Sequence, residues 1–236
     1  MIYLTILLVT IEYTEDEIIS YFENHPSELG GMNMTRGKLI AIEGIDGAGK
    51  STIIEKLIDL LNSYGYKAIS HQEPGTTEMG LALRKLIKSD IPRSKLTELL
   101  MFEASRADTS ELVLSQELEQ YDYVILDRYI DSTVAYQGYG NQNPIEIISI
   151  LNDIAIGENK PDMRILIDVD LETAYKRRNK RKQTTDSKDK FDTNYEFAKR
   201  VYDGYQTLVE KDELISVPNT NINETLQQLL HLICGK

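Results

Sequence analysis

The sequence predicts a doubly wound α/β fold, in which helices cover both faces of a parallel sheet. From residue 37 onward, short β-favouring apolar runs alternate with longer stretches of helical periodicity, a pattern typical of βαβ units. A glycine-rich turn also joins the first of these strands to the first helix. The chain has 236 residues, 41% of them hydrophobic, which suits one domain with a full core.

Five apolar segments are the predicted strands, at residues 38–43, 66–71, 123–126, 163–169 and 214–217. The first helix is predicted over 51–64, because its Ile and Leu residues recur at helical spacing and Gly65 follows. The remaining helices are predicted over 79–89, 96–120, 144–156, 171–182, 194–209 and 224–233. The expected sheet is therefore five-stranded and parallel.

Residues 1–36 precede this pattern and are interpreted as an N-terminal extension of unknown role or as a wrongly chosen start codon. Residues 2–11 are apolar, lack a preceding basic residue and are too short to span a bilayer. A strand or an appendage is therefore favoured over a signal peptide. Thr14 and Glu17 form a capping-box pattern that predicts a short helix. The domain itself is expected over 37–236.

The net charge and the cysteine content bear on the partners and the compartment of the protein. Lys and Arg number 26 against 38 Asp and Glu, which gives a formal net charge of −12. Such a surface disfavours non-specific binding to nucleic acid or to anionic membranes, since both are polyanions. The one cysteine, Cys234, cannot form a disulfide within the chain. We therefore expect a reducing compartment, the cytoplasm.

The strongest motif is the run Gly-Ile-Asp-Gly-Ala-Gly-Lys-Ser at 44–51, which matches G-x-x-x-x-G-K-[ST] between a strand and a helix. Backbone N–H groups of such a loop converge on phosphate oxygens, the lysine reaches the β- and γ-phosphates, and the hydroxyl binds Mg²⁺. The predicted ATP-binding residues are Gly44, Ile45, Asp46, Gly47, Ala48, Gly49, Lys50, Ser51 and Thr52.

The loop alone does not decide the reaction. A GTPase would carry N-K-x-D after a strand, but here Asn159-Lys160-Pro161-Asp162 precedes the strand at 163–169 and is interpreted as coincidence. Asp127 ends an apolar strand, where a carboxylate either helps to hold Mg²⁺ together with Ser51 or simply caps the strand. Arg128 follows at the same edge, and its guanidinium suits a bidentate grip on an acceptor phosphate.

Several blocks together resemble thymidylate kinases. They are residues 42–52, Glu73-Pro74-Gly75-Thr76, residues 99–107, Asp127-Arg128-Tyr129 with Ser132 and residues 135–138, and Lys160-Pro161-Asp162 with Asp168 and Val169. They occur in the family's order from about residue 37 to the C-terminus. The resemblance implies a P-loop nucleoside monophosphate kinase fold that converts ATP and dTMP to ADP and dTDP with Mg²⁺. It also implies a homodimer.

The resemblance further assigns dTMP-binding roles. It implies that Asp46 accepts a hydrogen bond from the sugar 3′-hydroxyl, and that Arg128 holds the acceptor phosphate beside Glu73 and Ser132. It implies that Phe102 stacks on thymine and Arg106 bonds the carbonyl edge of the base. Phe102 as ordinary core packing is the alternative. Tyr136 is expected to crowd the 2′ position, and Gln137 to lie near the base.

Two departures from the family matter. Gln72 precedes Glu-Pro-Gly where an arginine is usual, and Gly47 occupies the position where some members carry a catalytic arginine. Phosphoryl transfer still needs positive charge, so a small lid over residues 177–191 is expected to supply it from Arg177 and Arg181. These two lie four apart and share a helical face. The alternative for these two arginines is an ordinary solvated helix end.

Two alternatives stay open for the function of the whole chain. It could be a kinase of a different nucleotide or nucleoside, or a non-catalytic P-loop regulator.

Overall fold

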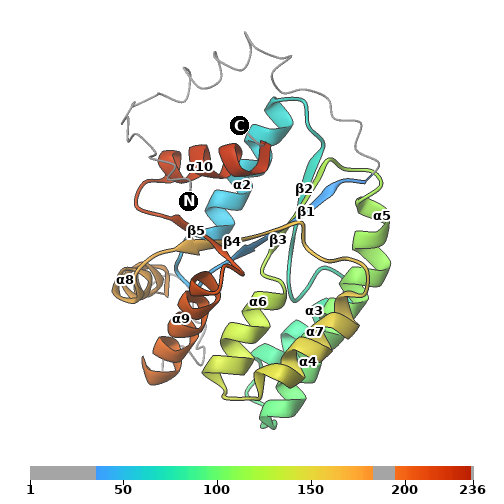
Figure 1. The fold of residues 1–236 in the computed structure, drawn as a ribbon. Helices are drawn as coiled ribbons and strands as arrows, with labels where there is room; N and C mark the ends of the chain where they lie inside the picture. The colour runs from blue at the N-terminus through green and yellow to red at the C-terminus, as the bar shows by residue number, and fades with distance from the viewer. Residues whose placement is uncertain (1–35, 183–194, 235–236) are drawn as a thin grey trace, which may run out of the picture. The chain divides into compact units, whose positions relative to one another are not determined.

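The structure, a computed structural model, describes residues 36–182 and 195–234, and for 178–182 the backbone alone. Its sheet has five parallel strands in the order β2-β3-β1-β4-β5 (Figure 1). The strands are β1 (Lys38–Glu43), β2 (Ala68–Gln72), β3 (Tyr123–Asp127), β4 (Met163–Asp168) and β5 (Ile215–Pro218). The predicted fold class and strand count are confirmed. The expected strand and helix before residue 36 lie outside the described residues.

The two faces of β1 explain why the chain forms this sheet. Ile40 and Ile42 belong to the larger core cluster, with Leu57 of the helix α2 (Lys50–Ser63) and Leu229 of the helix α10 (Ile222–Cys234). Leu39 and Ala41 face the other way, into a second cluster that includes Ile156 of the helix α7 (Ile145–Ile156). Side chains of a strand alternate between faces, and a parallel sheet is covered on both. Figure 1 accordingly shows α2 and α10 on one side of the sheet and α7 on the other.

The helices mostly follow the predicted segments. They are α2 (Lys50–Ser63), α3 (Glu78–Lys88), α4 (Lys95–Thr109), α5 (Ser115–Glu117), α6 (Ile130–Thr133), α7 (Ile145–Ile156), α8 (Leu171–Lys182), α9 (Tyr195–Glu210) and α10 (Ile222–Cys234). Two wider, π-helical segments are η2 (Ser110–Leu114) and η3 (Val134–Gly140).

The helix predicted over 96–120 is interrupted by η2. The Asn159 side chain donates to the carbonyl and hydroxyl oxygens of Ser110 at 2.9 and 3.0 Å, and to the hydroxyl of Ser115 at 3.1 Å. These bonds satisfy polar groups where the regular helical ladder is broken. Asp162 accepts from the Leu39 N–H at 2.7 Å. Asn159 and Asp162 of the N-K-x-D sequence thus make structural hydrogen bonds in this chain.

No helix was predicted over 130–140, where α6 and η3 occur. The segment is rich in Ser, Thr, Tyr and Gly, which resembles a loop in sequence. Close packing against α9 forms it instead: a Cβ added to Gly140 would lie 2.7 Å from the Phe197 ring. A Cβ added to Gly204 would lie 2.7 Å from the Tyr139 ring. Tertiary contacts therefore override the weak local helix propensity.

Candidate active site at the carboxyl ends of the strands

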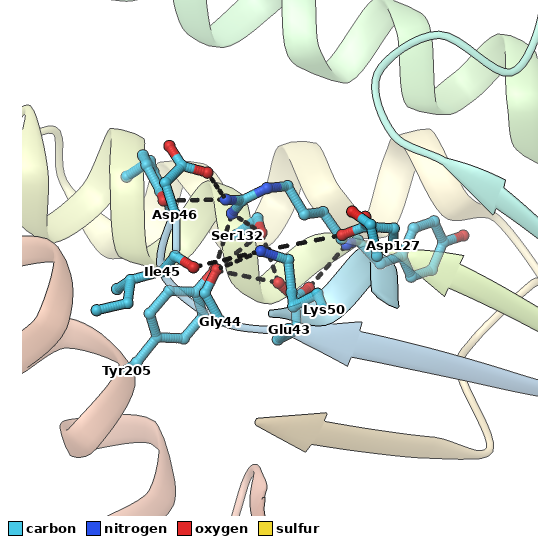
Figure 2. Close-up of polar contacts among 12 residues, drawn as sticks. Glu43, Gly44, Ile45, Asp46, Lys50, Asp127, Ser132 and Tyr205 are labelled. Carbon is cyan, nitrogen blue, oxygen red and sulfur yellow. Dashed lines mark hydrogen bonds and ion pairs between the residues drawn. The ribbon is translucent and has the colours of Figure 1, made fainter. Parts of the chain in front are cut away.

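The phosphate loop leads from β1 into α2. Gly47 and Gly49 adopt positive φ angles of 92° and 94°, which glycine reaches without steric cost. The α2 helix begins at Lys50, so its N-terminus opens onto the loop. The Lys50 ammonium donates to the carbonyl of Gly44 at 3.0 Å and reaches that of Ile45 at 3.4 Å. The loop and its lysine are therefore held in one arrangement (Figure 2).

Lys50 is buried, and this changes its acidity. Burial, followed by the positive charge of Arg128, lowers its pKa to about 8. The carboxylates of Asp127, Asp46 and Glu43 oppose that shift without reversing it. Phosphate oxygens placed against this ammonium would favour its charged form, as an opposite charge always does. The loop lysine is thus matched to an anionic ligand.

Ser51 and Asp127 supply the oxygen atoms that a magnesium ion prefers. The Ser51 hydroxyl donates to Asp127 Oδ2 at 2.9 Å, so the two predicted ligands lie together. The other oxygen, Oδ1, is buried and accepts no hydrogen bond, and the Lys50 ammonium lies 3.9 Å from it. A buried acceptor without a donor fits a cation neighbour. Among the described residues, no three His, Cys, Asp or Glu side chains cluster as metal ligands.

Arg128 occupies the turn directly after β3. Its φ is 78°, a left-handed conformation uncommon outside glycine. Its guanidinium donates to Asp46 at 2.6 Å, to the Tyr136 hydroxyl at 3.0 Å and to the Ser132 hydroxyl at 3.1 Å. It also lies 4.8 Å from the centre of the Tyr136 ring. Four residues predicted for the acceptor side, Asp46, Arg128, Ser132 and Tyr136, are therefore brought together.

Glu73 lies next to this group, in the loop after β2. Its backbone N–H bonds the Asp127 carbonyl at 3.1 Å, and its buried carboxyl accepts from the hydroxyls of Thr109 and Thr76. Burial raises the pKa of Glu73 to about 7, although the charge of Arg106 and the two hydroxyls act in the opposite direction. Oε2 has no hydrogen-bond partner. This carboxyl can therefore change protonation state near neutral pH.

Comparison with known proteins decides the family. The family model described as thymidylate kinase matches residues 42–229. A thymidylate kinase of Trichodesmium erythraeum is 37% identical over 219 residues, covering 84% of this chain and 94% of the relative. One from Thermoanaerobacter sp. is 38% identical over 177 residues, covering 75% and 85%. The crystal structure of thymidylate kinase from Ehrlichia chaffeensis superposes with a TM-score of 0.66 at 29% identity, covering 84% of this chain and 98% of that one.

The chain belongs to the thymidylate kinase family. The resemblance seen in the sequence is thereby confirmed. The roles of individual residues in the site of this thymidylate kinase family member stay predictions. No helix among residues 36–182 and 195–234 has both the length and the apolar character that crossing a bilayer requires.

The α4 residues predicted to bind the base have different surroundings. Phe102 is half-buried. Arg106 is buried and donates to Glu103 at 2.8 Å, to Asn152 at 2.9 Å and to the Tyr129 carbonyl at 3.0 Å. Its Nε is buried without a hydrogen-bond partner. One donor of a fixed guanidinium is thus available, and contact of Arg106 with a base remains a prediction.

Gln137 and the lid arginines are placed less completely. Gln137 is buried in η3, and its backbone carbonyl accepts from the Asn143 side chain at 2.7 Å. Arg177, in α8, has an exposed side chain that donates to the Asn219 carbonyl at 3.2 Å. The side chain of Arg181 and residues 183–191 of the expected lid lie outside the described residues. The shared helical face of Arg177 and Arg181 therefore stays a prediction.

Contacts with α8 also explain Gly47. A Cβ at Gly47 would lie 2.3 Å from the Ala174 carbonyl oxygen, and its φ of 92° already favours glycine. An arginine at this position would displace the first turn of α8. The phosphate loop thus has no space for an arginine at this position, and charge supplied from α8 stays a prediction.

Sequence reasoning missed four residues around the site. Arg84 of α3 donates to the Pro74 carbonyl at 2.5 Å, and its charge interacts with Asp127, Asp46 and Glu73. Asn219 donates to the Ala48 carbonyl at 2.6 Å and so supports the phosphate loop. The others, Glu43 and Tyr205, contact Ser132. Of the four, only Glu43 could have been noticed in the sequence, because it is a charged residue at the end of an apolar strand.

Proposed function

We propose that this chain transfers the γ-phosphoryl group of ATP to dTMP and releases ADP and dTDP. Membership of the thymidylate kinase family supports the reaction. The observation that carries it is the contact between the phosphate loop and the acceptor arginine: Asp46 of the loop lies 2.6 Å from Arg128. Donor and acceptor groups thus meet at one sheet edge, where open α/β sheets bind their ligands.

The transfer needs charge and alignment more than covalent chemistry. An oxygen of the dTMP phosphate attacks the γ-phosphorus, the bond to the β–γ bridging oxygen breaks, and ADP leaves with that electron pair. Residues 44–52 would bind the donor phosphates, Lys50 would offset the charge on the transferring group, and Arg128 would align the acceptor. Arg177 and Arg181 would add positive charge. The acceptor phosphate is ionised near neutral pH, so no strong general base is required.

Mg²⁺ would bind at Ser51 and Asp127, where the spare buried oxygen of Asp127 fits it. There it would neutralise part of the charge on the donor phosphates. Around the acceptor, Asp46, Glu73 and Ser132 would contact sugar and phosphate. Phe102, Arg106, Tyr136 and Gln137 would select the deoxyribose and the base.

An acceptor panel tests the reaction. ADP release is measured with dTMP, dUMP, dCMP, dGMP and free thymidine, and we expect a clear preference for dTMP. Preference for thymidine, or indifference to the base, would mean a different nucleotide or nucleoside kinase. Lys50→Ala and Arg128→Ala should each abolish most turnover, with Lys56→Ala as the control on an exposed position of α2. Unchanged turnover in both site variants would mean that Lys50 and Arg128 do not form the active site. Absence of ADP release with every acceptor would favour a non-catalytic regulator.

We also propose that two copies pair through the outer face of α3, α4 and α7. These helices pack side by side, α3 on α4 and α4 on α7 (Figure 1). Together they expose eight large apolar side chains: Met79, Leu81, Leu86, Leu96, Leu100, Ile147, Ile150 and Ile154. Ile147, Ile150 and Ile154 form one stripe along α7, since they recur at helical spacing. An apolar face of this extent is typical of an interface.

Light scattering after size exclusion tests the pairing. Ile150→Glu should convert a dimer to a monomer, because a charge would be buried at the interface. The matched control is Ile215→Glu, which places the same charge on exposed β5, away from these helices. A monomeric unsubstituted chain, or a dimer that Ile150→Glu leaves intact, contradicts this interface.

A further inference from the structure

Behind the acceptor arginine lies a buried carboxylate that the reaction itself does not use. Glu43, the last residue of β1, is fully buried. One of its oxygens accepts from the Tyr129 backbone N–H at 2.7 Å. The other accepts from the hydroxyls of Ser132 and Tyr205. Three donors to one carboxylate offset the cost of burying its charge. Glu43 therefore fixes the orientation of both hydroxyl groups.

The two hydroxyls stand between Glu43 and Arg128. Their oxygens lie 2.9 Å apart, and Arg128 Nη1 is 3.1 Å from that of Ser132 and 3.4 Å from that of Tyr205. A hydroxyl has a single hydrogen to donate. When that hydrogen is directed to the carboxylate, the lone pairs face the guanidinium. The hydrogen bonds thus run in one direction, from the arginine through the hydroxyls to the buried acid, as the convergence of Glu43, Ser132 and Tyr205 in Figure 2 illustrates.

The same residues also restrain the backbone. Arg128 has its left-handed φ of 78° while its N–H donates to the Ile42 carbonyl at 3.0 Å. The next N–H, that of Tyr129, donates to Glu43. Strained conformations persist where the surroundings over-determine them. Both ends of the arginine, its backbone and its guanidinium, are therefore tied to the last two residues of β1.

Tyr205 brings a third element into this arrangement. It lies in the middle of α9, is 1% exposed, and is 77 residues from Arg128 in sequence. Burial and the charge of Glu43 raise its pKa well above the ordinary value of 10, so the phenol remains a hydrogen-bond donor at any working pH. A side chain that only filled the core at this position could be a phenylalanine, so the hydroxyl of Tyr205 points to a role in the hydrogen-bond network.

We propose that Glu43 and Tyr205 are positioning residues that orient Arg128 for the acceptor phosphate, acting with the hydroxyl of Ser132. This rests on the proposed function of Arg128. In this proposal neither residue touches a nucleotide. They fix the direction of the guanidinium, and small misplacements of such a group cost catalysis heavily. Steady-state kinetics with both substrates varied can separate this role from a purely structural one.

The central variant is Tyr205→Phe, which removes one hydroxyl and keeps the ring. We expect kcat/KM for dTMP to fall about tenfold, while KM for ATP changes by less than about twofold. The matched control is Tyr123→Phe, which also removes the hydroxyl of a buried tyrosine, at the opposite end of β3 from Arg128. Both variants should lower Tm, but only Tyr205→Phe should change the dTMP kinetics.

Glu43→Gln provides a second variant, since an amide group in place of the carboxylate oxygen conflicts with two donating hydroxyls. Its effect on kcat/KM for dTMP should exceed that of Tyr205→Phe. If both Tyr205→Phe and Tyr123→Phe lower Tm and neither changes the dTMP kinetics, Tyr205 is structural and the proposal is wrong.

A double-mutant cycle separates this proposal from the proposed function. In an Arg128→Ala background, Tyr205→Phe should cause no further loss in kcat/KM for dTMP, because the group it orients is gone. Independent, multiplying losses would contradict positioning through Arg128. If Arg128→Ala by itself leaves turnover unchanged, the proposed role of Arg128 in binding the acceptor is wrong. That single variant therefore tests the proposed function, and the double-mutant cycle tests the positioning of Arg128.

Discussion

The two arginines assigned to opposite sides of the reaction differ sharply in their surroundings. Arg128 makes hydrogen bonds to Asp46, Tyr136 and Ser132, and its backbone is bound to β1. Arg177 is exposed on α8 and donates to one backbone carbonyl, that of Asn219. A fixed charge stabilises a transition state without reorganisation, whereas an exposed one must be brought into place. We therefore expect the acceptor side of the site to be preorganised, and the proposed lid side to depend on movement.

The largest expected effect is at Arg128. Arg128→Lys keeps the charge but removes the planar fork that serves four oxygen partners at once. We expect kcat/KM for dTMP to fall by roughly 10²–10³-fold, close to the loss in Arg128→Ala. Steady-state kinetics with dTMP varied measures this. Near-complete rescue by lysine would mean that charge alone matters and that the preorganised geometry does not.

A somewhat smaller effect is expected on the lid side. Arg177→Ala or Arg181→Ala should lower kcat by about 10²-fold if either carries charge in the transition state. The control is Lys176→Ala, whose ammonium is paired with Glu172 at 2.6 Å on the exposed surface. A rise in KM for ATP with unchanged kcat would reassign the arginine to ATP binding. Equal losses of kcat in all three variants would contradict a specific catalytic role for Arg177 or Arg181.

A third prediction concerns Glu73 on the acceptor side, whose burial should make the free energy of unfolding depend on pH. Its pKa of about 7 in the folded protein exceeds the value of 4.5 for an exposed carboxyl, so the folded state holds the proton more tightly. The contribution of Glu73 to stability is therefore present at low pH and is lost as pH rises from 4.5 to about 7. Relative to Glu73→Gln, the unsubstituted chain should lose up to about 3 kcal/mol over that range. Urea unfolding of both proteins across pH 4–8 measures the difference, and parallel curves would contradict it.

The smallest effect concerns Lys50, between the two sides. Its pKa of about 8 means that the ammonium loses its proton as pH rises above that value. Affinity for a non-hydrolysable ATP analogue should then fall by up to about tenfold per pH unit above 8, since phosphate oxygens require the cation. Calorimetric titration at several pH values provides the measurement. Lys50→Arg, which stays charged, should flatten the profile even if it binds more weakly.

Comparison of the two sides also shows what sequence reasoning can reach. Arg128 and Asp46 were predicted from contiguous motifs, and the structure brings them within 2.6 Å. Tyr205 was not predicted, because a tyrosine on an amphipathic helix looks like ordinary core until the fold places it beside the site. Arg84 was missed for a similar reason, since one basic residue in a surface helix carries no pattern.

The sequence by itself determined the sheet, the phosphate loop and the family. Each depends on local spacing: alternating elements, glycines within eight residues, and a strand end followed by Asp127 and Arg128. The tertiary structure alone decided the π-helical segments, the helix at 130–140 and the network of Glu43, Ser132 and Tyr205 behind the acceptor arginine. These features join residues far apart in sequence, and their energies come from packing and buried hydrogen bonds that no local pattern encodes.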